Sequence, residues 1–166
     1  MENDFPKRKT TRLKDFDYSK CGSYFVTICT EKRKNLLSVI VGEGSSLPRL
    51  MPYGKIADKW INELPCKYRE ISVDHYVVMP NHIHLILSVK HDRGREDPSP
   101  TVSTVIGWLK YQITKDINDL GESKCEKIFQ RSFYDHVIRN QDDYMEIAKY
   151  IKDNPARWYY DKLYNE

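Results

Sequence analysis

The spacing of hydrophobic and polar positions changes several times along the chain. β-Branched and aromatic residues with apolar alternation are typical of strands, and they occur in three stretches. These predicted strands cover residues 23–30, 71–79 and 82–90. Pro80 and Asn81 separate the last two and predict a turn. Glycine, serine, proline and charged residues predict loops at 42–52 and 91–100.

Apolar residues spaced by three and four positions predict three helices. These cover 53–63, a stretch from Thr101 or Ser103 to Asp119, and a stretch from Asp142 or Asp143 to about Asn154. The last helix should end there because Pro155 disfavours helical backbone at the residue before it. Residues 127–138 predict a further strand and turn. This order indicates the α+β class with a largely antiparallel sheet.

The composition is that of one globular domain. A chain of 166 residues can bury a sizeable core. With 31% charged residues, a mean hydropathy of −0.68 and no long apolar run, no membrane span is expected. The polar N-terminus predicts no signal peptide. The four cysteines lie far apart without a Cys-x-x-Cys pair, which argues against a zinc knuckle and fits a reducing cytoplasm.

Positive charge is concentrated near the N-terminus. Residues 1–34 have nine basic and five acidic side chains, a net charge of +4, whereas the whole chain is only +3. Basic residues together with twelve tyrosines suit nucleic acid, because cations neutralise phosphates and rings stack on unpaired bases. A solvated tail explains the same charges. We expect a basic arm over residues 1–20 and a single domain over 21–166.

The strand at 82–90 has two histidines on one face. Ile83, Leu85, Leu87 and Val89 alternate with them and form a wholly apolar face that should meet the core. His82 and His84 then share the opposite face, about 7 Å apart along the strand. Two imidazoles at this spacing can bind one divalent ion. They could equally be two surface histidines on a half-exposed sheet.

The last predicted helix has a tyrosine at the edge of its apolar stripe. Tyr150 lies roughly 110° from the centre of the stripe, so it can point into a cleft, and Asn154 shares its face. A phenol is a poor nucleophile until a metal or a base assists it. An exposed surface tyrosine and a residue at a helix end are the simpler interpretations. The stripe consists of Tyr144, Ile147, Ala148 and Ile151.

Three segments together resemble a known family. MPNHIHLIL at 79–87 resembles the HUH motif of single-tyrosine transposases, with Ile83 as the bulky apolar residue. Residues 131–158 resemble their tyrosine helix. Residues 12–33 are similar to the start of the REP-associated tyrosine transposases, relatives of the insertion-sequence-200-like transposases. The resemblance spans about residues 8–160 and implies a ferredoxin-like or RRM-like fold, with the HUH motif on a central strand.

The resemblance also implies a reaction. His82 and His84 would bind Mg²⁺ or Mn²⁺, Tyr150 would be the nucleophile, and Asn154 would be a third ligand at a position that is often glutamine in the transposases. Single-stranded or hairpin DNA would be cleaved through a 5′-phosphotyrosine intermediate, and a 3′-OH would then accept the strand without ATP. Because imidazole ligands must be neutral, activity should fade below about pH 6.

Several basic residues are candidates for DNA contacts. The resemblance implies that the arm grips the hairpin, and further cations could hold backbone phosphates. The arm residues are Arg8, Lys9, Arg12 and Lys14, and the others are Lys32, Arg33, Lys34, Lys110, Arg131 and Arg139. The resemblance implies that the protein acts as a monomer or a homodimer.

Two other functions remain open. A non-catalytic DNA- or RNA-binding module could retain the RRM-like sheet and the arm. A small metal-dependent hydrolase could use His82 and His84 with water and would form no covalent adduct. The absence of a His-Glu-x-x-His motif counts against the hydrolase.

Overall fold

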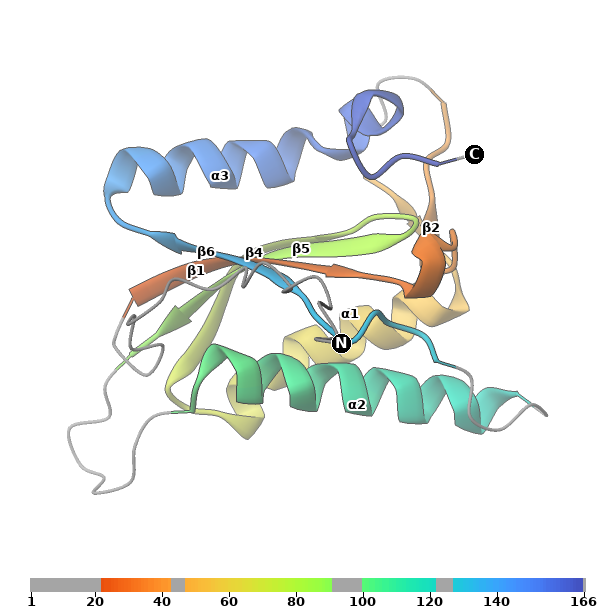
Figure 1. Cartoon of the computed structure of the whole chain (residues 1–166), viewed down its shortest axis with the longest axis horizontal. Coiled ribbons are helices and arrows are strands. Elements are labelled where there is room, and N and C mark those ends of the chain that lie inside the picture. The colour runs from red at the N-terminus through yellow and green to blue at the C-terminus, as the bar shows by residue number, and fades with distance from the viewer. Residues whose placement is uncertain (1–21, 43–46, 91–99, 122–126, 166) are drawn as a thin grey trace, which may run out of the picture.

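A four-stranded antiparallel sheet forms the centre of the protein (Figure 1). The computed structural model describes residues 22–42, 47–90, 100–121 and 127–165. The strand order is β4-β5-β1-β6, and every neighbouring pair is antiparallel. The strands are β1 (Gly22–Cys29), β4 (Ile71–Val78), β5 (His82–Val89) and β6 (Tyr134–Ile138).

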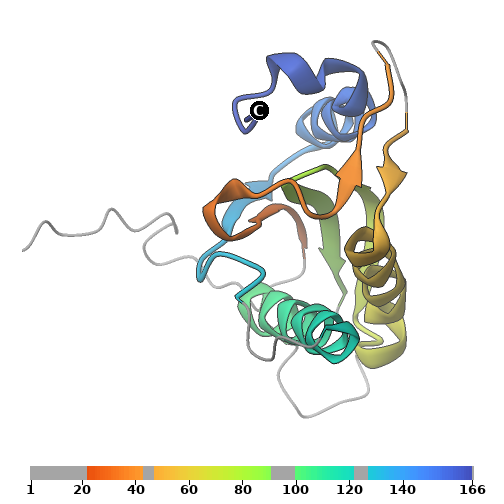
Figure 2. The ribbon, with the colours of Figure 1, turned by 90° about the vertical axis from the view of Figure 1, so that its right-hand side faces the viewer.

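Two helices connect the strands in the order of a ferredoxin-like fold. Helix α1 (Pro52–Lys67) lies between β1 and β4, and α2 (Val102–Leu120) lies between β5 and β6. The resulting βαββαβ order confirms the predicted α+β, ferredoxin-like class. Both helices cover one face of the sheet, and α3 (Gln141–Asp153) lies across the other (Figures 1 and 2).

The remaining elements are short. A 3₁₀ helix η1 (Glu31–Arg33) follows β1, and η2 (Pro155–Tyr160) follows α3. Strands β2 (Ser38–Val39) and β3 (Arg49–Leu50) pair with each other. The prediction of a loop over 42–52 was therefore wrong at Arg49–Leu50, because a strand of two residues has no detectable alternation.

The residues between α2 and α3 are less regular than predicted. Only the second part of 127–138 is strand, as β6, and Phe129 adds one isolated bridge to Thr30.

Helices α2 and α3 are capped at their N-termini by side chains. Thr101 accepts a hydrogen bond from the Thr104 backbone, and Asn140 accepts one from the Asp143 backbone. Among the described helices, none has the length and apolar character needed to cross a membrane.

The face of the sheet toward α1 and α2 is the main core. Ile83, Leu85, Leu87 and Val89 are all buried there, as the alternation predicted. Tyr24, Val26 and Ile28 of β1 join them. The opposite face of β5 and β1 therefore presents His82, His84, Thr27 and Phe25 toward α3.

Helix α3 is attached to that second face by a smaller hydrophobic cluster. Ile151 is buried against the sheet residues Val77 and Ile86. The predicted stripe of α3 is confirmed, because Tyr144, Ile147 and Ala148 pack against the same cluster. Burial of one such side chain stabilises the fold by about 1.5–3 kcal/mol. This packing positions the residue next to Ile151, Tyr150, beside the sheet.

Candidate active site

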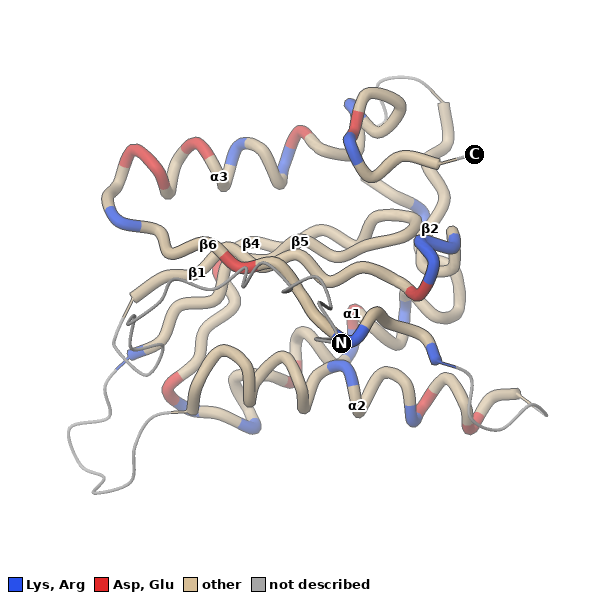
Figure 3. The backbone as a smooth tube through the Cα atoms, in the orientation of Figure 1, with Lys and Arg blue, Asp and Glu red and all other residues tan. Residues whose placement is uncertain are grey.

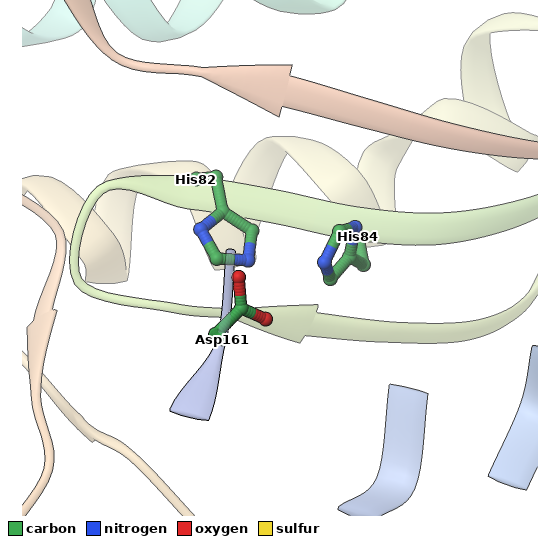
Figure 4. A group of neighbouring side chains, drawn as sticks. All are labelled: His82, His84 and Asp161. Atoms are coloured by element: carbon green, nitrogen blue, oxygen red, sulfur yellow. The ribbon is translucent and has the colours of Figure 1, made fainter. Parts of the chain in front are cut away.

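Two buried histidines and one carboxylate meet above the sheet. His82 and His84 project from the same face of β5, with ring centroids 4.4 Å apart. Asp161 follows η2 and points toward both rings (Figure 4). One ligand atom from each of the three residues lies within 4.8 Å of the other two. The chain thus brings together three potential ligands from two distant segments.

Hydrogen bonds orient both imidazole rings. Nδ1 of His82 lies 2.8 Å from Oδ1 of Asn81, and Asn81 Nδ2 donates to the Leu163 carbonyl oxygen and to Asn165 Oδ1. Because Oδ1 only accepts, Nδ1 of His82 donates and Nε2 carries the lone pair. That Nε2 is buried and has no hydrogen-bond partner in the part of the chain that the structure describes.

His84 is oriented from the neighbouring strand. Its Nδ1 lies 2.8 Å from the hydroxyl of Thr27, which is directly opposite in the β1–β5 register. A hydroxyl can accept the Nδ1 proton and so leave Nε2 free to act as a ligand. Partners of this kind fix the ring and the tautomer of metal-binding histidines.

Burial keeps both rings neutral. Burial, with a smaller effect of the nearby Arg33 charge, lowers the pKa of His82 to about 3. Burial also lowers the pKa of His84 well below its ordinary value, as does His82, while the Asp161 charge opposes the shift. Both imidazoles are therefore in the ligand state at neutral pH. Ordinary histidines would lose their capacity to bind a metal below about pH 6. These buried histidines stay neutral to a more acid pH, so the expected loss of activity moves to lower pH.

Tyr150 on α3 adjoins this group. Its hydroxyl lies 3.4 Å from Nε2 of His84 and donates to Oδ2 of Asp161, also at 3.4 Å. The side chain is 43% exposed, so a substrate can reach it. Burial, then the charge of Asp161 and its hydrogen bond, raise the pKa of Tyr150 to about 12, and Asn154 opposes them. The phenol therefore stays protonated without added positive charge.

Asn154 closes the group from the end of α3. Its Nδ2 donates to Oδ2 of Asp161 at 2.8 Å. Its Oδ1 is buried and lacks a hydrogen-bond partner among the described residues. Two neutral imidazoles, one carboxylate and one unpartnered amide oxygen form a donor set that suits a divalent cation.

Three residues of this site were missed from the sequence. Asp161 follows a 3₁₀ turn after Pro155, where no helical period connects it to Tyr150 or Asn154. The only signal was an acidic residue within an aromatic stretch. Thr27 could be identified only from the strand register, and Asn81 was interpreted as a turn residue.

The predicted basic residues are distributed unevenly. Arg33 and Tyr150 line a common hollow, and Lys32 and Lys34 are exposed in the same turn as Arg33. Figure 3 shows basic positions in this turn, beside β2, and further basic positions in the segment after α3. Arg139 lies at the start of α3, away from Tyr150, and Lys110 donates to the backbone of Gln130 and Arg131. The Arg131 side chain is exposed. Arg8, Lys9, Arg12 and Lys14 lie outside the described residues.

Sequence comparison finds related proteins of Haemophilus influenzae. No protein-family model matches the chain. An uncharacterized protein of Haemophilus influenzae is 29% identical over 170 residues, which cover 95% of this chain and 93% of that protein. A second H. influenzae protein, provisionally named as a REP-associated tyrosine transposase, is 24% identical over 85% of this chain and 74% of its own length.

Solved structures show the same fold. A REP-associated tyrosine transposase bound to a REP hairpin has a TM-score of 0.64 and 23% identity, covering 91% of this chain and 76% of its own. A Deinococcus radiodurans protein provisionally described as a transposase has a TM-score of 0.50 and 12% identity, over 86% of this chain and 95% of its own. With the sequence relatives, these findings show that the chain is similar in sequence and in fold to REP-associated tyrosine transposases.

Proposed function

We propose that this protein cleaves and transfers single-stranded DNA at the foot of a hairpin, with Tyr150 as the nucleophile. The observation that carries the proposal is the contact of the Tyr150 hydroxyl with both His84 and Asp161. A partly exposed phenol beside two neutral imidazoles and a carboxylate suits phosphoryl transfer better than packing. The transposase bound to a REP hairpin supports hairpin DNA as the substrate class.

The residues of the chain account for the covalent steps. The oxygen of Tyr150 attacks the scissile phosphorus, and Asp161, whose Oδ2 accepts a hydrogen bond from the phenol at 3.4 Å, can take the phenol proton. The bond from phosphorus to the 3′ oxygen breaks, and this oxygen takes a proton from water. The products are a 5′-phosphotyrosine and a free 3′-OH. A second 3′-OH can attack the phosphotyrosine, which restores Tyr150 and joins the strands without ATP.

The donor set fits a divalent cation, Mg²⁺ or Mn²⁺. Nε2 of His82, Nε2 of His84, and oxygens of Asn154 and Asp161 would hold it. When bound, the cation supplies positive charge that neutralises the scissile phosphate and makes the phenol more acidic. Asp161 is thus proposed as a further metal ligand, in addition to His82, His84 and Asn154, which were predicted from the sequence.

The proposal also addresses assembly and location. Tyr150 contacts His84 of its own chain, which supports a reaction within one protomer and makes a monomer sufficient. A homodimer remains compatible with this arrangement. Action on chromosomal DNA implies the cytoplasm, and the exposed basic turn at 32–34 and Arg131 are suited to backbone phosphates.

The test is a search for a covalent adduct. Hairpin oligonucleotides with unpaired flanks and a 3′-end label are incubated with protein and Mn²⁺, then separated under denaturing conditions. The wild type should form a labelled adduct that maps to Tyr150. Tyr150→Phe should form none, whereas Tyr111→Phe, at an exposed tyrosine on α2, should behave as wild type.

The other functions give different results. Hairpin binding without any adduct from the wild type would favour the non-catalytic module. Cleavage that persists in Tyr150→Phe, with no adduct, would favour a hydrolase that uses water at His82 and His84.

A further inference from the structure

A hollow of about 550 Å³ lies beside Tyr150, over β1 and the edge strand β6. His84, Tyr150 and Asp161 form part of its wall, so it is continuous with the candidate active site. Its volume is within the range of roughly 300–1,000 Å³ typical of small-ligand sites. A group bound here would be next to whatever reacts with Tyr150.

Aromatic rings form the sheet side of this hollow. Phe25 on β1 and Tyr134 on β6 belong to neighbouring strands, with ring centroids 6.4 Å apart and planes at 71°. The Phe25 ring also lies 5.2 Å from that of His84 and 6.1 Å from that of Tyr150. Tyr134 is 51% exposed, so its ring is accessible to a ligand from solvent. Exposed rings on an open sheet face are stacking surfaces for unpaired bases.

Polar and charged groups complete the wall. Arg33 and Lys162 supply positive charge for phosphate oxygens, and Gln130 and Ser132 can exchange hydrogen bonds with the edge of a base. The backbone of Arg33 has a φ of 53°, a left-handed conformation uncommon outside glycine, and its carbonyl oxygen accepts from Asn165 Nδ2 at 2.7 Å. The segment after α3 thus holds Arg33 at the hollow.

We propose that this hollow binds one unpaired nucleobase, that of the nucleotide adjoining the scissile phosphate, stacked on Tyr134 with Phe25 at its edge. The proposal rests on the DNA cleavage inferred above. It adds that the nucleotide adjoining the scissile phosphate must be unpaired. A base within a duplex is already stacked on both faces, so it cannot use these rings. The hollow therefore selects a nucleotide outside the paired stem.

Binding measurements in a Tyr150→Phe background test the site without cleavage. Hairpin oligonucleotides with unpaired flanks each contain one abasic nucleotide, at successive positions around the cleavage point. Tyr134→Ala should weaken binding of the intact oligonucleotide by about 5- to 150-fold, since one stacked base contributes about 1–3 kcal/mol. Tyr134→Trp should bind like the parent. Tyr111→Ala, on the helix layer beneath the sheet, is the matched control.

The double-mutant comparison identifies the stacked base. When the abasic nucleotide replaces the stacked one, the affinity of the parent protein, Tyr150→Phe, should fall by a factor similar to that caused by Tyr134→Ala. Adding Tyr134→Ala should then cause no further loss of affinity for that oligonucleotide. A fluorescent 2-aminopurine at that position should be quenched on binding by the parent but not by Tyr134→Ala. The melting temperature of each variant shows whether it is folded.

Two results would overturn the proposal. One is unchanged binding by a folded Tyr134→Ala, and the other is an equal loss for every abasic substrate. Either result leaves the proposed function intact if wild-type protein still forms the Tyr150 adduct. If no oligonucleotide is bound or cleaved by wild type, the proposed function fails, and the base site fails with it.

Discussion

At the residue scale, the two histidines depend on neighbours that fix their rings. The Thr27 hydroxyl is 2.8 Å from Nδ1 of His84 and is the partner of that nitrogen across the strand pair. Removing such a partner costs about 10- to 100-fold in metal affinity. We expect Thr27→Val, which keeps the shape, to weaken Mn²⁺ binding by this factor in titration calorimetry. Ser23→Ala, on the same strand and bonded to Ser88, should bind as wild type. Equal affinity in Thr27→Val would show that the Thr27 hydroxyl does not position His84 for metal binding.

The acid stability of the metal-free protein should reflect the buried histidines. In the unfolded chain His82 takes up a proton near its ordinary pKa of 6.5, whereas in the folded protein it does so only near 3. Between these values the unfolded state binds more protons, so stability falls as pH decreases. The slope is up to about 1.4 kcal/mol per pH unit for each such histidine. His82→Gln should reduce the stability lost between pH 6.5 and 5, as measured by urea unfolding. An unchanged slope would show that His82 is not held neutral.

Residue patterns revealed part of this site. His82 and His84 followed from strand alternation, and Tyr150 and Asn154 from helix spacing. Asp161 lies in an irregular segment, so only the folded chain brings it near them. Phe25 and Tyr134 meet through pairing of strands more than a hundred positions apart, which no local pattern encodes.

At the element scale, α3 controls where Tyr150 lies. Ile151 anchors this helix to the second face of the sheet, and Ile113 of α2 is buried in the main core on the first face. Each change to alanine should cost about 2–5 kcal/mol of stability. A displacement of 1 Å at a reacting group can cost about 100-fold in rate.

The two changes should therefore separate stability from activity. At a temperature where both variants are folded, Ile151→Ala should reduce the rate of adduct formation by at least about 10-fold. Ile113→Ala should retain nearly the wild-type rate. An equal loss of rate in both variants would show that general destabilisation, rather than the position of α3 on the sheet, determines the rate.

The major elements were predictable because their patterns are long. The sheet strands β1, β4 and β5 and the helices α2 and α3 were each predicted within a few residues, and α1 extends four residues beyond its predicted end. Strand β6 was predicted less well, since it is short and half-exposed on the edge of the sheet. Strands β2 and β3 depend on each other for pairing, and each is too short to show a period.

At the scale of the whole molecule, the site joins segments that are far apart in sequence. His82 and His84 come from β5, Tyr150 and Asn154 from α3 and its end, and Asp161 from the segment after η2. That segment also bonds to the β4–β5 turn, through Asn81 to Leu163 and Asn165. A cation shared by these groups would hold the sheet, the helix and the final segment together.

A divalent cation should therefore stabilise the fold as well as the site. A ligand that binds only the folded state at 100 times its Kd adds about 2.7 kcal/mol. For a chain of this size, about 2–4 °C per kcal/mol corresponds to a rise in Tm of roughly 5–10 °C with Mn²⁺ over a chelator. Hydrogen exchange should slow in residues 155–165 under the same conditions, because Asp161 is then fixed. His84→Gln should lose both effects. His136→Gln, at a histidine on the same sheet face that pairs with Asp143, should keep them. A rise in Tm that survives in His84→Gln would place the cation elsewhere and leave the Tyr150 chemistry without its metal.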